Sequence, residues 1–141
     1  MIARIAKLCF WGYVLMLLGI GASGILIAPW ELKHVFMLPL DSLADMVQAT
    51  LLNQYRFMKA VELSFGLFCW VWHRSIFQPG LFNRVFLIGV FLGVAARLLS
   101  WLIDGQPHWV FLIFAALELL TGILCYWTVS RGLESNTRGF L

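Results

Sequence analysis

Long apolar stretches separated by short polar segments are the main feature of the hydrophobic pattern. A membrane-crossing helix needs about 20 mostly apolar residues, and four stretches reach that length. They cover about residues 8–28, 53–72, 85–103 and 107–130. The pattern therefore predicts an all-α integral membrane protein, a four-helix bundle that forms one domain over residues 1–130. A short polar tail is predicted at residues 131–141.

The composition supports a membrane protein. The chain has 141 residues, of which 62% are hydrophobic and only 12% are charged. A soluble domain usually carries about 25% charged residues, so a water-soluble globule is excluded and the lipid bilayer is the first expected partner. The net charge of +3, with no basic run, also excludes nucleic acid as a partner.

Basic residues near the ends of the apolar stretches predict the orientation of the chain. They fall before the first stretch, between the second and third, and after the fourth. These residues are Arg4, Lys7, Arg74, Arg84, Arg131 and Arg138. Four crossings place all of them on one side of the membrane, and basic residues near helix ends favour the cytoplasmic side. We therefore predict that both termini are cytoplasmic.

The longest connection, residues 29–52, contains a pattern typical of a helix start. Asp45 stands three residues after Ser42, as the acid of a capping box does. Residues that follow recur at helical spacing, and they are Leu43, Met46, Val47, Thr50 and Leu51. Two interpretations stay open. The segment is either a short amphipathic helix in the outer loop, on the membrane surface or over the bundle, or an extension of the second membrane helix.

Ionisable side chains lie within three of the apolar stretches. The second stretch contains Arg56, Lys59 and Glu62, the third contains Arg97, and the fourth contains Glu118. Each unpaired charge near the middle of a membrane helix costs about 2.5–3.5 kcal/mol on insertion scales. We therefore expect these side chains to face the inside of the bundle and to pair with one another.

Counting residues from the outer membrane surface places four of these charges at similar depths. With a rise of ~1.5 Å per residue, Lys59 and Arg97 lie about 9 Å from the outer ends of their helices, Glu62 about 13 Å and Glu118 about 16 Å. Lys59 and Arg97 then balance Glu62 and Glu118 in one buried network. Arg56 lies nearer the surface, where a long side chain can extend to the headgroups.

Small residues share a helix face with these charges. Gly66 follows Glu62 by four residues, Gly122 follows Glu118 by four, and Gly93 precedes Arg97 by four. Small residues let membrane helices approach closely. The charged face is therefore predicted to be the packed interface of the bundle.

Three interpretations of the charge network stay open. It is a structural ion-pair network that fixes the register of the helices, a polar pocket open to the outer side, or a network that a charge on another subunit completes. In the pocket interpretation, Arg56, Lys59 and Arg97 hold an anionic or carbonyl-bearing ligand. A desolvated Glu62 or Glu118 then takes up a proton.

No catalytic or metal-binding motif accompanies these charges. The sequence has no GxSxG, Walker or HExxH pattern. Its three histidines are scattered and its three cysteines include no CxxC pair, so neither set has the spacing of a metal site. We predict no metal, no catalytic residue and no cofactor, and a quinone or lipid stays a candidate ligand.

Three short motifs resemble one small family of bacterial membrane proteins. They are Arg56–Glu62 (RFMKAVE), Ala96–Ser100 (ARLLS) followed by Asp104–Pro107 (DGQP), and Leu117–Gly122 (LELLTG). That family has four transmembrane helices and is catalogued only as a domain of unknown function. The similarity covers about residues 8–130. It implies the four-helix fold and a multi-pass location in the bacterial inner membrane, and it implies no established reaction.

The match to that family is position by position. The matching residues are Arg56, Arg97, Asp104, Gly105, Pro107, Glu118 and Gly122. This resemblance adds Asp104, in the short outer turn, to the candidate site residues, whereas Lys59 and Glu62 are less clearly part of the pattern. A looser likeness to the DoxX-like membrane proteins implies a link to quinone or thiol redox chemistry, as found in some of them.

The sequence as a whole predicts a non-catalytic accessory or assembly subunit of an inner-membrane complex. Its partner is then another membrane protein or a second copy of this chain. The alternative is a binder, transporter or enzyme for a small anionic, lipid or quinone ligand, with Glu118 as proton carrier and Arg97 as anion anchor. The candidate residues for binding a ligand or partner are Arg56, Lys59, Glu62, Arg97, Asp104 and Glu118.

Overall fold

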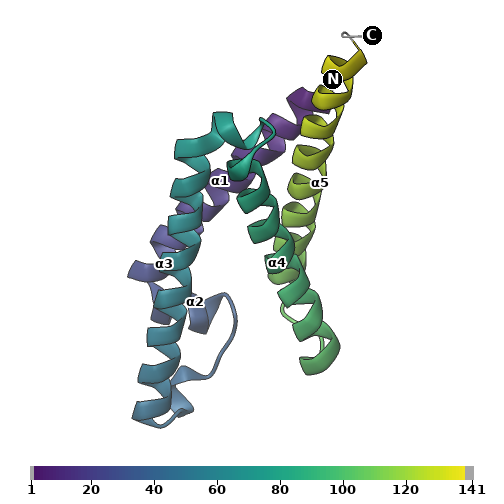
Figure 1. The fold of residues 1–141 in the computed structure, drawn as a ribbon. Helices are drawn as coiled ribbons and strands as arrows, with labels where there is room; N and C mark the ends of the chain where they lie inside the picture. The colour runs from purple at the N-terminus through teal and green to yellow at the C-terminus, as the bar shows by residue number, and fades with distance from the viewer. Residues whose placement is uncertain (1, 139–141) are drawn as a thin grey trace. The chain divides into compact units, whose positions relative to one another are not determined.

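All regular structure in the described chain is helical (Figure 1). The computed structural model describes residues 2–138, with side chains as far as Gly132. The elements, in chain order, are α1 (Ile2–Leu26), α2 (Ala28–His34), the 3₁₀ turn η1 (Leu40–Ser42), α3 (Asp45–Ile76), α4 (Leu81–Asp104) and α5 (Trp109–Arg138). The predicted all-α fold class is confirmed for these residues.

Three of the helices are long and apolar enough to cross a membrane. They are α1, α4 and the part of α5 from Trp109 to Gly132. The longest helix, α3, has 32 residues, but Arg56, Lys59 and Glu62 interrupt its apolar sequence. At least three helices of the chain can therefore cross a membrane by their length and composition. A fourth crossing, by α3, stays a prediction.

The connection between the first two predicted membrane segments is more ordered than the hydrophobic pattern indicates. α1 ends at Leu26, and Pro29 stands in the first turn of α2, where proline is tolerated because the N–H it lacks has no helical partner. Residues 45–51 belong to α3. These residues therefore continue the helix that contains the second apolar stretch, and they do not form a separate helix in the loop. At the other end of the chain, α5 continues through Arg138 into the predicted tail.

The described chain divides into two compact units, and each is described by itself. Unit 1 contains the residues up to Tyr13 and those from Cys69 onward, whereas unit 2 contains Val14–Phe68. Because the boundaries fall inside α1 and α3, each of these helices contributes a segment to both units.

In unit 2, short helical segments pack on the first half of α3. The buried apolar core formed there consists of Ala28, Leu32, Leu40 and Tyr55. α1 also packs against α3, and glycine sets how closely. A Cβ added to Gly21 would lie only 2.8 Å from the backbone nitrogen of Leu63. This is the close approach that small residues allow between membrane helices.

In unit 1, α4 and α5 form an antiparallel hairpin (Figure 1). α4 ends at Asp104 and is followed by Gly105, which has a φ of 96°, a left-handed conformation that favours glycine at a helix end. Further along the hairpin, a Cβ added to Gly122 of α5 would lie 3.1 Å from side-chain carbons of Val90 and Phe91 on α4. The predicted small-residue face of these helices is therefore a packed interface.

Candidate functional site

Arg97 of α4 and Glu118 of α5 form a two-pronged ion pair across the hairpin of unit 1. The Arg97 Nε donates to Glu118 Oε2 at 3.0 Å, and Nη2 donates to Oε1 at 3.2 Å. The Glu118 side chain is only 7% exposed, whereas that of Arg97 is 32% exposed. A guanidinium fits a carboxylate in this way because its N–H groups form a planar fork. The pair predicted from helix depth is therefore present.

Aromatic rings and a glycine surround this pair. The Arg97 Cζ lies 5.8 Å from the ring centre of Phe111 and 6.0 Å from that of Phe114, a range in which a cation is attracted to the ring face. A Cβ added to Gly93 would lie 3.7 Å from Glu118 Oε2, which is ordinary van der Waals contact. The Glu118 carboxylate is thus held between Arg97 and the small face of α4.

A pocket of about 360 Å³ lies beside Arg97 in unit 1. Most of its wall is apolar, formed by Leu98, Trp101, Pro107, Phe111, Leu112 and Ala115. Arg97 and Ser100 supply its polar groups. A guanidinium has five N–H groups, and Glu118 accepts from two of them, which leaves three that Glu118 does not occupy. An apolar pocket with a few convergent polar groups is typical of sites for small organic ligands.

Lys59 and Glu62 form the second ion pair, within α3 and inside unit 2. The Lys59 Nζ donates to Glu62 Oε2 at 2.9 Å, and the Lys59 side chain is only 4% exposed. Its aliphatic stem lies against α1 at Gly24, where an added Cβ would be 2.6 Å from Lys59 Cγ and Cδ. A residue larger than glycine at position 24 would therefore displace the buried lysine.

Glu31 and Tyr55 extend this second cluster, and the sequence analysis did not identify either as a site residue. Both are buried, at 9% and 7% exposure, and the Tyr55 ring lies 5.4 Å from the Lys59 Nζ. The Tyr55 hydroxyl interacts electrostatically with the Glu31 and Glu62 carboxylates. Neither Tyr55 Oη nor Glu31 Oε2 has a hydrogen bond of acceptable geometry to a described residue.

The sequence did contain a signal for Glu31. It lies three residues after Ala28 and directly before Leu32, so these residues share one face of a helix that begins near Pro29. A short amphipathic helix at this point would have predicted that Glu31 is buried along with its apolar neighbours. The hydrophobic pattern assigns Glu31 and Leu32 to the connection at 29–52 and predicts no helix at its start.

Arg56 and Asp104 lie apart from the ion pairs of their own units. The exposed Arg56 donates from Nε to the backbone oxygen of Ile25 at 3.3 Å, in the last turn of α1, where carbonyl groups lack helical partners. The exposed Asp104 accepts a hydrogen bond of 2.7 Å from the Ser100 hydroxyl. Of the predicted site residues, the structure thus joins Arg97 with Glu118 and Lys59 with Glu62. One network shared by both pairs stays a prediction.

The described side chains include no group of three or more His, Cys, Asp or Glu residues placed to hold a metal ion. The three cysteines are free thiols, and Cys69 and Cys125 are buried.

The chain matches one family of known proteins. Neither a curated protein nor a solved structure matches it, and the likeness to DoxX-like proteins has no support among the matches. The family model that matches is the one described as "Domain of unknown function (DUF4345)", over residues 5–129. This span contains both ion pairs and the pocket beside Arg97. The chain therefore belongs to the DUF4345 family.

Proposed function

We propose that the chain crosses the inner membrane of a bacterium four times, with both termini in the cytoplasm. At ~1.5 Å per residue, the part of α3 from Asp45 to the kink at Trp72 extends for about 40 Å, which exceeds the ~30 Å hydrocarbon core. The burial and pairing of Lys59 lower the cost of placing its charge there. An even number of crossings also agrees with the basic residues near the helix ends.

We propose further that the protein binds a small amphipathic ligand in the pocket beside Arg97. The observation that carries this proposal is the position of Arg97, whose guanidinium lines an apolar pocket of about 360 Å³. The N–H groups that Glu118 does not occupy suit a carbonyl or carboxylate oxygen. Trp101, Phe111 and Leu112 suit a ring or an acyl tail. A quinone or a fatty acid has both parts.

Glu118 acts on this site through Arg97. Its carboxylate accepts hydrogen bonds from two of the guanidinium N–H groups. These two bonds fix the plane of the guanidinium, so the other N–H groups point away from Glu118. Ser100 supplies a hydroxyl to the pocket wall, and that hydroxyl donates to the exposed Asp104 carboxylate. We propose ligand binding without a covalent step, in agreement with the non-catalytic role that the sequence predicts.

The binding proposal is tested with the full chain in detergent micelles. The probes are a benzoquinone with a decyl tail and, separately, oleate, and the quenching or shift of tryptophan fluorescence reports binding because Trp101 lines the pocket. Ala115→Leu fills the pocket and is expected to weaken probe binding by about tenfold or more. Ala116→Leu is the matched control, because it adds the same side chain at an exposed position outside the pocket. Equal binding by both variants and the unaltered protein would contradict the proposal.

A second function, assembly with another membrane helix, is favoured by one face of α1. Exposed residues recur along it at intervals of four and three, and three of them are small and three are leucines. They are Leu8, Gly12, Leu15, Gly19, Ala22 and Leu26. Nothing lies within 4 Å of a Cβ added to Gly12 or Gly19, so a partner helix has room to approach at both glycines.

The assembly proposal predicts a change in mass. Gly12→Leu combined with Gly19→Leu is expected to release the partner, measured by the mass of the complex in mild detergent. Ala116→Leu on α5 is again the control for added bulk. If the double variant keeps the same mass as the unaltered protein, this face of α1 is not the contact.

A further inference from the structure

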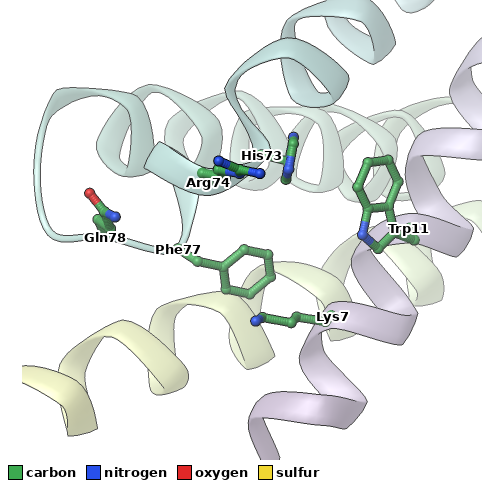
Figure 2. Close-up of a pocket in the computed structure, with 6 residues that line it drawn as sticks. All are labelled: Lys7, Trp11, His73, Arg74, Phe77 and Gln78. Atoms are coloured by element: carbon green, nitrogen blue, oxygen red, sulfur yellow. The ribbon is translucent and has the colours of Figure 1, made fainter.

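A second pocket, of about 470 Å³, lies in unit 1 between the start of α1 and the end of α3. Its wall is formed by Lys7, Trp11, His73, Arg74, Phe77 and Gln78. Figure 2 shows Lys7 and Trp11 of α1 facing the residues from the end of α3 and the connection after it. This pocket shares no residue with the one beside Arg97.

The charge of this pocket is positive. Lys7 and Arg74 are both exposed, and neither forms an ion pair with a described acidic side chain. None of the described residues that line the pocket is acidic. Two cations in one concave site, with no counter-ion among the described side chains, suit an anion.

The aromatic part of the pocket is held by packing within unit 1. The Phe77 ring lies 5.2 Å from that of Phe10, which is itself fully buried. The Trp11 ring lies 5.2 Å from His73. The His73 Nδ1 is 2.8 Å from the backbone oxygen of Trp70, and since a carbonyl oxygen only accepts, Nδ1 carries the hydrogen. These contacts fix the rings before any ligand arrives.

Local backbone structure places the two cations. Lys7 and Trp11 are four residues apart and so share one face of α1. On α3, Trp72 departs from helical geometry, with φ −99° and ψ 17°, directly before His73 and Arg74. The connection after α3 is then fastened to α4, because the buried Asn83 donates from Nδ2 to the backbone oxygen of Ile76 at 2.7 Å.

The position of the pocket along the helices indicates where a ligand would come from. Lys7 and Trp11 lie within the first three turns of α1, and His73 and Arg74 lie in the last turn of α3. The ends of membrane helices lie at the level of the lipid headgroups, where tryptophan and extended Lys and Arg side chains are enriched. Basic pockets between helices at this level bind anionic headgroups.

We propose that this pocket binds the phosphate of an anionic phospholipid headgroup. Lys7 and Arg74 contact the phosphate oxygens, and Trp11 and Phe77 contact the glycerol and the first carbons of the acyl chains. This goes beyond the function proposed above, because both the place and the recognised group differ. A phosphate bears a full charge, whereas the pocket beside Arg97 is mostly apolar.

The experiment compares lipid binding by the full chain in detergent. Native mass spectrometry measures the affinity for dioleoyl phosphatidylglycerol and for dioleoyl phosphatidylcholine. The unaltered protein is expected to prefer phosphatidylglycerol, and Lys7→Gln combined with Arg74→Gln is expected to weaken its binding by about tenfold or more. Phosphatidylcholine carries the same phosphate beside a choline cation, which two pocket cations repel, so its binding is expected to be weaker in the unaltered protein and to change less in the variant.

Two control variants separate this pocket from general charge attraction. Arg4→Gln with Arg84→Gln removes the same charge from two exposed positions outside the pocket, and is expected to keep the preference for phosphatidylglycerol. Lys7→Arg with Arg74→Lys keeps both charges and is also expected to keep it. The proposal is wrong if Arg4→Gln with Arg84→Gln lowers the affinity for phosphatidylglycerol as much as Lys7→Gln with Arg74→Gln does. It is also wrong if the unaltered protein does not prefer phosphatidylglycerol to phosphatidylcholine.

The last arm distinguishes a lipid from free phosphate. Inorganic phosphate is added in large molar excess to the complex with phosphatidylglycerol. The lipid is expected to stay bound, since Trp11 and Phe77 add contacts that a free anion lacks. Displacement of the lipid would show that the site takes free phosphate and would overturn the assignment to a lipid. Circular dichroism of each variant checks that the helical content is unchanged.

Discussion

The two buried ion pairs stabilise their units in different ways. Arg97 and Glu118 belong to two helices, 21 positions apart in the sequence, and form two hydrogen bonds. Lys59 and Glu62 belong to one turn of α3 and form one hydrogen bond. The first pair therefore connects α4 to α5, whereas the second neutralises charge within a single helix.

The balance of buried charge also differs between the units. In unit 1, one carboxylate faces one guanidinium. In unit 2, Glu62 is paired with the buried Lys59, whereas the buried Glu31 has no ion-pair partner among the described residues. An uncompensated buried charge is costly. The two units therefore differ in how completely their described buried charges are balanced.

The largest expected effect is that of breaking the pair in unit 1. Arg97→Leu leaves the buried Glu118 carboxylate without its cation, and we expect a loss of about 3–5 kcal/mol in the free energy of unfolding. Glu118→Leu is expected to cost less, because the Arg97 side chain is 32% exposed and reaches water or headgroups. The measurement is unfolding of the purified protein in mixed micelles, followed by circular dichroism.

The double variant sharpens this prediction. Arg97→Leu combined with Glu118→Leu removes both charges and is expected to recover most of the stability. It is also expected to lose the binding of the quinone or oleate probe, since the polar group of the pocket is gone. If the double variant recovers its stability and still binds the probe, the role of the Arg97–Glu118 pair is purely structural. A double variant as unstable as Arg97→Leu would show that the two side chains are not coupled.

The sequence predicted the Arg97–Glu118 pair because its determinants are local and periodic. Two apolar stretches joined by a short turn form an antiparallel hairpin, so charges in the outer halves of both helices lie close enough for the long Arg97 side chain to reach Glu118. Arg97 and Glu118 lie on the faces that also carry Gly93 and Gly122, which the structure shows to be packed. Charge cost, depth and small-residue spacing then all indicate the same contact.

Unit 2 was less predictable because its arrangement depends on a connection. The burial of Glu31 follows from the way α2 and η1 pack on α3 through Leu32 and Leu40. Hydrophobic periodicity over a helix of seven residues is a weak signal. The extent of α3 was uncertain for a related reason, since its amphipathic start and its apolar middle differ in pattern although they form one helix.

The next effect concerns the glycines that set the distance between helices. Gly21→Ala would place a Cβ 2.8 Å from the Leu63 backbone nitrogen, and backbone yields less readily than the end of a side chain. We expect a loss of about 1–3 kcal/mol. Gly93→Ala in unit 1 is the matched variant, with an added Cβ 3.7 Å from Glu118 Oε2, and is expected to be tolerated. If both variants lower the free energy of unfolding by the same amount, the helices of unit 2 are not more closely packed at Gly21 than those of unit 1 are at Gly93.

The smallest effect tests the excess acid in unit 2. Glu31→Gln keeps the shape of the side chain and removes its charge, so we expect stability to be unchanged or raised by about 1 kcal/mol. Glu62→Gln is the matched control, and it is expected to lower stability because it takes the counter-ion from the buried Lys59. Both variants are measured by unfolding in mixed micelles at neutral pH. If Glu31→Gln destabilises as much as Glu62→Gln, the Glu31 charge is compensated in the folded protein, and the charge imbalance inferred for unit 2 does not exist.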